Sequence, residues 1–387
     1  MTMPQHVHVS APAKVLLFGE HAVVYGCPSI AAALSQVRLS VFIDRIDDPK
    51  ISFMFDDIQC TINGSKVPLC RQYSVEAIAA VARDYPSDDH YVPRPSTAVL
   101  SAIENVLQHT EADASVMTTL RPALFLCCAV LRASSILLQT PHTHGLRIRV
   151  SAASFPVGAG LGSSAAFSVA LAGGLLQVRD QQPSSSLTEI NAFAYSAEVI
   201  LHGSPSGVDN TVSTFGGALK FTKLPLPASQ PIDGDLSKFR ILIVNTRVPR
   251  STKALVAGVR ARYDEDPSRT QSQFDAIQAI VNQFVELSAD GALTESVLGQ
   301  LMEQNHSILN ALGVGHDEIE KVATECKREG MWTKLTGAGG GGCTVTLVPG
   351  FLAEDRLNAV MKTLESKGFQ CFLSTIGGCG FSVESIA

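Results

Sequence analysis

The stretch 156–166 (PVGAGLGSSAA) has the residue types and spacing most typical of a phosphate-binding loop. Its three glycines alternate with other residues, so the backbone can turn tightly and approach a ligand without an intervening Cβ. Ser163 or Ser164 stands where the N-cap of the Ala-rich apolar run 167–178 is expected. The free N–H groups and positive dipole end of that helix would attract an anion. An ordinary serine-capped glycine connection is the alternative, but the alternation favours phosphate binding.

Other residues able to do chemistry are scattered along the chain. Lys14 begins an apolar strand, and Glu20 and His21 follow a glycine at the end of that strand, where exposed polar groups are often functional. Glu198 falls near the end of a predicted helix, and Asp209 lies in a turn-rich segment. Each has an ordinary alternative: a solvated lysine, a solvated helix face, or a simple N-cap.

Several common nucleotide and hydrolase motifs are excluded. Gly337, Gly339 and Gly342 formally match the dinucleotide-binding pattern, but a strand follows them where that site requires a helix. The chain contains no Gly-Lys pair, so it has no Walker A loop. It also lacks the G-x-S-x-G elbow of serine hydrolases. These patterns leave phosphate handling by a different type of loop.

Composition limits the classes of function. At 387 residues the chain is long for one core, so two domains are expected. A net charge of -6 argues against nucleic-acid or membrane-surface partners, which require a basic excess. The start has no signal-peptide pattern, and no apolar run reaches the length of a membrane span. Nine cysteines without metal-site spacing indicate free thiols in a reducing cytoplasm.

Hydrophobic periodicity predicts strands and helices mixed in both halves of the chain, an α+β pattern. Strands are predicted at 7–10, 15–18, 39–44, 145–150, 217–221, 239–245, 344–348 and 369–374, with a hairpin turning at Asn63-Gly64. Helices are predicted at 75–82, 98–108, 121–139, 167–178, 187–201, 256–263, 274–287, 299–312, 317–330 and 353–367. The Pro-rich segment 224–235 suggests a boundary between domains 1–230 and 231–387.

Taken together, three stretches resemble the GHMP kinase family: 12–26 (PAKVLLFGEHAVVYG), 156–166, and 334–343 (KLTGAGGGGC). They occur in the family's order and at its spacing. The stretches 202–210 (HGSPSGVDN) and 245–252 (NTRVPRST) resemble the members that phosphorylate mevalonate. Galactokinases carry Thr-Asp after Glu-His in the first motif, and phosphomevalonate kinases lack the Glu-His pair.

The resemblance implies a two-domain fold with the active site between the domains. The N-terminal domain would be similar to ribosomal protein S5 domain 2, and the C-terminal domain would be ferredoxin-like. The implied reaction is the ATP- and Mg²⁺-dependent phosphorylation of the C5 hydroxyl of (R)-mevalonate, which feeds isoprenoid and sterol synthesis. Such an enzyme is a phosphotransferase with an alcohol as acceptor.

The resemblance also implies roles for individual residues. Asp209 would be the general base, with Lys14 beside it stabilising charge on the reacting oxygens. Ser164 and Glu198 would hold Mg²⁺ with the β- and γ-phosphates. Residues implied to line the mevalonate pocket are Glu20, His21, Asp209 and Thr252. Residues implied to bind ATP are Lys14, Gly158, Ala159, Gly160, Leu161, Gly162, Ser163, Ser164, Gly339 and Gly340.

Relatives of this kind are typically homodimers and are often inhibited by farnesyl and geranylgeranyl diphosphates that compete with ATP. The resemblance therefore suggests both properties for this chain, which we expect to be cytoplasmic. Two alternatives stay open at this point. The chain could be a related kinase acting on a sugar, homoserine or a phosphorylated isoprenoid precursor. It could also be a non-catalytic sensor with the same fold, although it keeps Lys14, Glu198 and Asp209.

Overall fold

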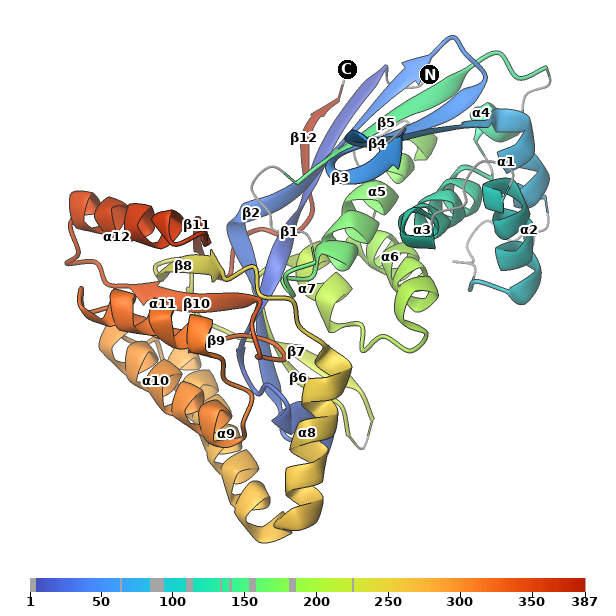
Figure 1. The fold of residues 1–387 in the computed structure, drawn as a ribbon. Coiled ribbons are helices and arrows are strands. Elements are labelled where there is room, and N and C mark those ends of the chain that lie inside the picture. The colour runs from blue at the N-terminus through green and yellow to red at the C-terminus, as the bar shows by residue number, and fades with distance from the viewer. Residues whose placement is uncertain are drawn as a thin grey trace.

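The computed structural model describes residues 5–62, 65–83, 94–108, 114–132, 134–138, 141–152, 158–180, 186–224 and 226–386. Two sheets organise these residues (Figure 1). Among the described residues, no helix is both long and apolar enough to cross a membrane. The mixture of helices and strands confirms the predicted α+β class.

The larger sheet has eight strands and carries the N-terminal part of the chain. Its main path runs in the order β12, β1, β2, β5, β3 and β4, and β6 joins β2 and β7 beside it. The strands are β1 (His6–Phe18), β2 (Ser29–Ile46), β3 (Lys50–Ile62), β4 (Ser65–Ser74), β5 (Gly145–Ser151), β6 (Ala218–Thr222), β7 (Ala228–Pro231) and β12 (Ser382–Ile386).

Helices pack against this sheet, and the central one, α5 (Ser163–Asp180), is largely buried. The helices of this part are η1 (Ala22–Tyr25), α1 (Val75–Ala82), α2 (Thr97–Gln108), α3 (Ala114–Leu131), α4 (Ser135–Leu138), α5 (Ser163–Asp180), α6 (Leu187–His202) and α7 (Val208–Phe215). Leu171 and Leu175 of α5 are fully buried. Gly174 lets α5 approach the sheet, since a Cβ there would lie 2.9 Å from Ile43 on β2. The glycine loop therefore leads into a helix fixed by the core.

The smaller sheet has four antiparallel strands in the order β11 (Gln370–Thr375), β8 (Arg240–Asn245), β10 (Cys343–Val348) and β9 (Trp332–Leu335). The helices of this part are α8 (Thr252–Glu265), α9 (Pro267–Ala289), α10 (Glu295–Ala311), α11 (Asp317–Lys327) and α12 (Glu354–Ser366). Its β10 is entirely buried. The division of the chain near residue 230 stays a prediction, and β12 returns from the chain end to the larger sheet beside β1 (Figure 1).

Several predicted elements differ from the observed ones. The strands at 7–10 and 15–18 are one strand, β1, whose register with β2 shifts between Pro12 and Lys14. The predicted helix 121–139 is wrong in its bounds, because α3 begins at Ala114 and ends at Leu131, with Pro122 inside it and α4 following separately. The hairpin of β3 and β4 is confirmed, although its tip, Asn63-Gly64, lies outside the described residues.

Candidate active site

A cavity of about 590 Å³ lies between the N-terminal and C-terminal parts of the chain. Segments from both parts of the chain line it: the end of β1, the start of η1, the glycine loop, the end of α6, the start of α7, the start of α8 and the stretch before β10. The polar residues predicted for catalysis and metal binding all border this cavity, namely Lys14, Ser164, Glu198 and Asp209.

Lys14 and Asp209 form an ion pair inside the cavity. The Nζ of Lys14 lies 3.0 Å from Oδ1 of Asp209, and their side chains are 8% and 39% exposed. Asp209 stands in the first turn of α7, behind an N-cap glycine, Gly207, with a left-handed φ of 79°. A Cβ on Gly162 would lie 2.9 Å from Cγ of Lys14 and 3.6 Å from Oδ2 of Asp209. The glycine loop therefore packs directly against this pair.

The described part of the glycine loop requires glycine at alternate positions. Gly158, Gly160 and Gly162 have φ values of 77°, 88° and 74°, a region that other L-residues avoid. The expectation of a serine N-cap is wrong, because α5 begins at Ser163 and the carbonyl of Gly162 accepts from the N–H of Ala166. The Oγ of Ser163 instead accepts from the N–H of Gly158 at 3.2 Å. Positions 156 and 157 lie outside the described residues.

Ser164 and Glu198 lie side by side across the start of α5 and the end of α6. The Oγ of Ser164 donates to Oε2 of Glu198 at 3.0 Å, and Ser168 donates to Oε1 at 3.0 Å. The Nε2 of His202 lies 3.5 Å from Oε2 of Glu198. The hydrogen bond to Glu198 raises the pKa of His202 above its ordinary value.

This hydroxyl and carboxylate fit a hard divalent cation that also binds phosphate. Mg²⁺ prefers oxygen ligands and is commonly held by one or two carboxylates plus substrate phosphates and water. No cluster of three or more His, Cys, Asp or Glu side chains suited to a metal occurs among the residues the structure describes. A cation at Ser164 and Glu198 would therefore depend on the nucleotide for the remaining ligands.

Glu20 borders the cavity, but its carboxylate is paired with a residue that does not line the cavity. Its side chain is fully buried in an ion pair with Lys334 of β9. The Nδ2 of Asn305 on α10 donates to the second oxygen, Oε2, at 3.1 Å. Burial lowers the pKa of Lys334, and the neighbouring Glu20 opposes that effect. Glu20 thus ties the end of β1 to the smaller sheet.

His21 and Thr252 face the cavity from opposite parts of the chain. His21 has a φ of 59°, unusual for a residue with a side chain. Its Nε2 donates to the carbonyl of Ala338 at 2.8 Å, which holds the ring against the third glycine motif. Burial lowers the pKa of His21. Thr252 is the first residue of α8, so the N-terminus of that helix lies at the cavity.

Arg250 has a place in the site that its sequence motif alone did not reveal. One Nη donates to the carbonyl of Ala159 in the glycine loop at 3.2 Å, and the other to the carbonyl of Thr336 at 3.3 Å. Burial lowers the pKa of Arg250. A Cβ on Gly160 would lie 1.5 Å from Nη2 of this guanidinium. Arg250 therefore joins the first and last glycine-rich segments of the site, and its presence in the stretch 245–252 was the available signal.

Four residues expected at the nucleotide do not line the cavity: Ala159, Leu161, Gly339 and Gly340. Leu161 is buried, and its carbonyl accepts from the N–H of Lys14 at 2.9 Å. Gly340 donates its N–H to the carbonyl of Val314 at 2.8 Å. Within the third motif, Gly337 and Ala338 reach the cavity instead. Gly339 and Gly340 thus pack the third glycine motif against Val314, which also belongs to the C-terminal part of the chain.

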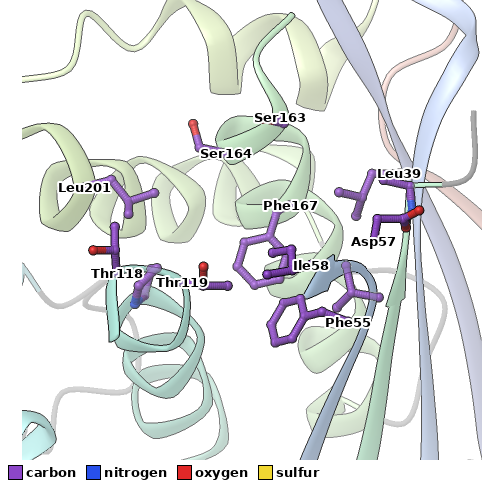
Figure 2. A pocket seen from close by; sticks show the side chains of 13 residues that line it. Leu39, Phe55, Asp57, Ile58, Thr118, Thr119, Ser163, Ser164, Phe167 and Leu201 are labelled. Carbon is purple, nitrogen blue, oxygen red and sulfur yellow. The ribbon is translucent and has the colours of Figure 1, made fainter. Parts of the chain in front are cut away.

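A second, apolar pocket of about 170 Å³ shares Ser163 and Ser164 with the main cavity. Figure 2 shows Phe167 of α5 pointing toward Phe55 and Ile58 at its centre. The rings of Phe55 and Phe167 have centroids 5.7 Å apart. Asp57 at its edge accepts from the N–H of Ala152 at 2.6 Å. The start of α5 therefore lies between a polar cavity and an aromatic pocket.

Comparison with protein families matches two regions of the chain. The model described as "GHMP kinases N terminal domain" matches residues 125–217. The model described as "GHMP kinases C terminal" matches residues 292–366. The first region holds the glycine loop and Asp209, and the second holds the third glycine motif.

Curated relatives extend the similarity over nearly the whole chain. The mevalonate kinase of Mus musculus is 34% identical, covering 98% of this chain and 95% of the relative. That of Homo sapiens is 33% identical, covering 97% and 94%. Among solved structures, L. major mevalonate kinase in complex with R-mevalonate superposes with a TM-score of 0.66 at 23% identity, covering 98% of both chains. At that identity the superposition shows the fold alone.

Proposed function

The chain belongs to the mevalonate kinases of the GHMP kinase family, and we propose that its own residues divide the reaction as follows. The enzyme transfers the γ-phosphate of ATP to the C5 hydroxyl of (R)-mevalonate. The observation that carries this assignment is the Lys14–Asp209 pair, held against the glycine loop in the cavity that both parts of the chain line.

Asp209 accepts the proton of the C5 hydroxyl as the oxygen attacks the γ-phosphorus. Lys14, 3.0 Å away, stabilises negative charge on the carboxylate and on the reacting oxygens. The transition state of phosphoryl transfer is loose, so positioning and charge neutralisation matter more than strong activation of the nucleophile. The short distance between Lys14 and Asp209 supports both roles.

Gly158, Gly160 and Gly162 bring the loop backbone to the phosphates, which then lie at the N-terminus of α5. Ser164 and Glu198 would hold Mg²⁺ there. When bound, this ion neutralises phosphate charge during transfer.

The apolar pocket in Figure 2 takes the base of ATP. It lies directly across Ser163 and Ser164 from the polar cavity, so one nucleotide can span both. An isoprenoid tail would fit the same aromatic walls while its diphosphate occupied the loop. This overlap supports competitive inhibition by farnesyl and geranylgeranyl diphosphates.

Mevalonate binds between His21, Thr252 and Asp209. The N-terminus of α8 at Thr252 would attract the carboxylate of mevalonate. Glu20 acts indirectly, because its carboxylate is buried against Lys334 and Asn305.

We place the enzyme in the cytoplasm as a homodimer; its nine unpaired cysteines support a reducing compartment.

The test is ADP release from purified protein with Mg-ATP and, separately, mevalonate, galactose, homoserine or phosphomevalonate. Turnover with mevalonate alone is expected. Turnover confined to another acceptor would show a related kinase with a different pocket. ATP binding without turnover on any acceptor would favour a non-catalytic sensor.

A further inference from the structure

The end of the chain crosses from the smaller sheet back to the larger one. After β11, residues 376–381 run past α7, and β12 then pairs with β1 (Figure 1). We call residues 376–381 the C-terminal strap. None of them lines the catalytic cavity, yet they contact α5 and α7, two of the helices that carry its polar groups.

Backbone hydrogen bonds join the strap to the C-terminal end of α7. The N–H of Phe381 donates to the carbonyl of Thr214 at 2.9 Å, and the N–H of Gly217 donates to the carbonyl of Gly378 at 2.9 Å. Thr214 is fully buried. These bonds satisfy groups at the end of a helix, where backbone carbonyls otherwise lack partners.

The contact leaves no room for side chains. A Cβ on Gly380 would lie 2.1 Å from the carbonyl oxygen of Thr214. A Cβ on Gly216 would lie 2.3 Å from the backbone nitrogen of Gly380. The ring of Phe381 packs so closely on α5 that a Cβ on Gly173 would lie 2.2 Å from it. The strap is therefore in close contact with both the C-terminal end of α7 and helix α5.

Arg38 on β2 fixes the other side of the strap. Its guanidinium donates to the carbonyls of Cys379 at 3.0 Å and Gly380 at 2.7 Å. It also donates to Oγ of Ser10 on β1 at 2.7 Å, and that hydroxyl donates to Glu384 of β12. The strap is thus anchored to the sheet as well as to the helices.

The catalytic carboxylate lies at the opposite end of the same short helix. α7 has eight residues, with Asp209 in its first turn and Thr214 in its last. At 1.5 Å per residue the two are separated by about 7.5 Å along the axis. The Oγ of Ser213 donates to the carbonyl of Pro12 at 2.8 Å, which ties the helix to β1 just before Lys14. A shift at the strap would therefore tilt Asp209 relative to Lys14.

We propose that the C-terminal strap is a positioning element that holds α7 so that Asp209 stays beside Lys14. This inference rests on the proposed function, in which Asp209 accepts the hydroxyl proton. The strap residues act through α7 and do not contact substrate. Because near-attack geometry is sensitive to displacements of about 1 Å, a small movement of α7 lowers the rate of transfer.

The test is the substitution Gly380→Ala, which inserts a Cβ against Thr214. Gly380 is not among the glycines with a positive φ, so alanine introduces this clash without positive-φ strain. The expected result is a fall in kcat of about 10- to 100-fold, with KM for ATP changed less than about threefold. The matched control is Gly258→Ala in α8, where the nearest atom to the new Cβ is 3.8 Å away, and kcat is expected to stay unchanged.

A double-mutant cycle separates positioning from general damage. In an Asp209→Asn background, Gly380→Ala should lower kcat by less than about threefold, because the group it misplaces is gone. An equal loss in both backgrounds would overturn the proposal. If Gly380→Ala does not fold, Arg38→Met releases the strap without a clash and enters the same cycle.

The outcomes distinguish a failure of the proposed function from a failure of the strap proposal. A wild-type protein that does not phosphorylate mevalonate would overturn the proposed function. An active wild type together with a folded Gly380→Ala variant of unchanged kcat would overturn the strap proposal alone.

Discussion

The Nζ of Lys14 lies 3.0 Å from Oδ1 of Asp209, and the glycine loop packs against both residues at Gly162. Lys14 comes from β1 of the larger sheet and Asp209 from the first turn of α7. The register shift in β1 between Pro12 and Lys14 marks where the strand departs from regular pairing next to this pair, as bulges near active sites commonly do. An ion pair and the glycine loop thus lie together at the cavity.

Substitutions in the glycine loop should separate the effect of a steric clash with Arg250 from the effect of backbone strain alone. Gly160→Ala is expected to lower kcat/KM for ATP by at least about 100-fold, roughly 2.7 kcal/mol of transition-state stabilisation. The new Cβ would lie 1.5 Å from Nη2 of Arg250, and the φ of 88° is unfavourable for alanine. The measurement is steady-state kinetics with varied ATP.

Gly158→Ala is the matched control for that loop substitution. Its φ of 77° imposes a similar backbone strain, but no atom lies within 4 Å of the new Cβ. Strain alone is worth about 1–2 kcal/mol, so its loss should be smaller. Equal losses for Gly158→Ala and Gly160→Ala would show that the contact with Arg250 is unimportant.

Removal of the proposed metal carboxylate should change the dependence on Mg²⁺. Glu198→Gln is expected to raise the Mg²⁺ concentration for half-maximal activity by about tenfold or more, because a neutral amide is a weaker ligand for a hard cation. Activity is measured at fixed ATP over a Mg²⁺ titration. Ser168→Ala, which removes only a hydrogen bond to Glu198, should shift the titration much less. An unchanged titration in Glu198→Gln would remove this residue from the metal site.

The buried pair of Glu20 and Lys334 should contribute to stability through charge compensation. Glu20→Gln is expected to lower the free energy of unfolding by about 3–5 kcal/mol, because it leaves the fully buried ammonium of Lys334 without its partner. Adding Lys334→Met should restore most of that loss. Denaturant unfolding of the two single variants and the double variant measures the coupling, and additive losses would argue against it.

Acidification should destabilise the protein partly through His21. Its folded-state pKa is lowered by burial, so below the ordinary value of 6.5 the unfolded state binds a proton that the folded state does not. The resulting stability is present above pH 6.5 and is lost as the pH falls through the folded-state pKa. One such group contributes at most about 1.4 kcal/mol per pH unit. The free energy of unfolding should fall less steeply between pH 7 and 5 in His21→Gln; identical slopes would exclude this contribution.

Local patterns predict two of the helices that carry proposed site residues, α5 with Ser164 and α6 with Glu198, but not α7, in which Asp209 lies. α1 matches its predicted bounds, Val75–Ala82, because its apolar spacing and the cap at Ser74 are both local signals. The glycine loop and α5 follow from the alternation of glycine and the apolar run after it. The helix predicted at 121–139 begins later than α3, because the first turns of α3 carry polar residues and Pro122 falls inside it.

Long-range packing explains what the sequence did not reveal. Glu20 and Lys334 meet only after the two sheets pack together. Arg250 looks like one more basic residue until the fold places it between Ala159 and Thr336. The short strand β12 depends on pairing with β1 at the other end of the chain. None of these contacts leaves a periodic signal.

The most direct test of the central claim is transfer of the γ-phosphate of ATP to mevalonate by wild type and by Asp209→Asn, measured in a single turnover with saturating Mg-ATP. Wild type should form phosphomevalonate. The variant should bind both substrates with near-normal affinity and form product at least about 10³-fold more slowly, since it loses both the base and the charge partner of Lys14. Product formation at the wild-type rate by Asp209→Asn would contradict the assignment of the base.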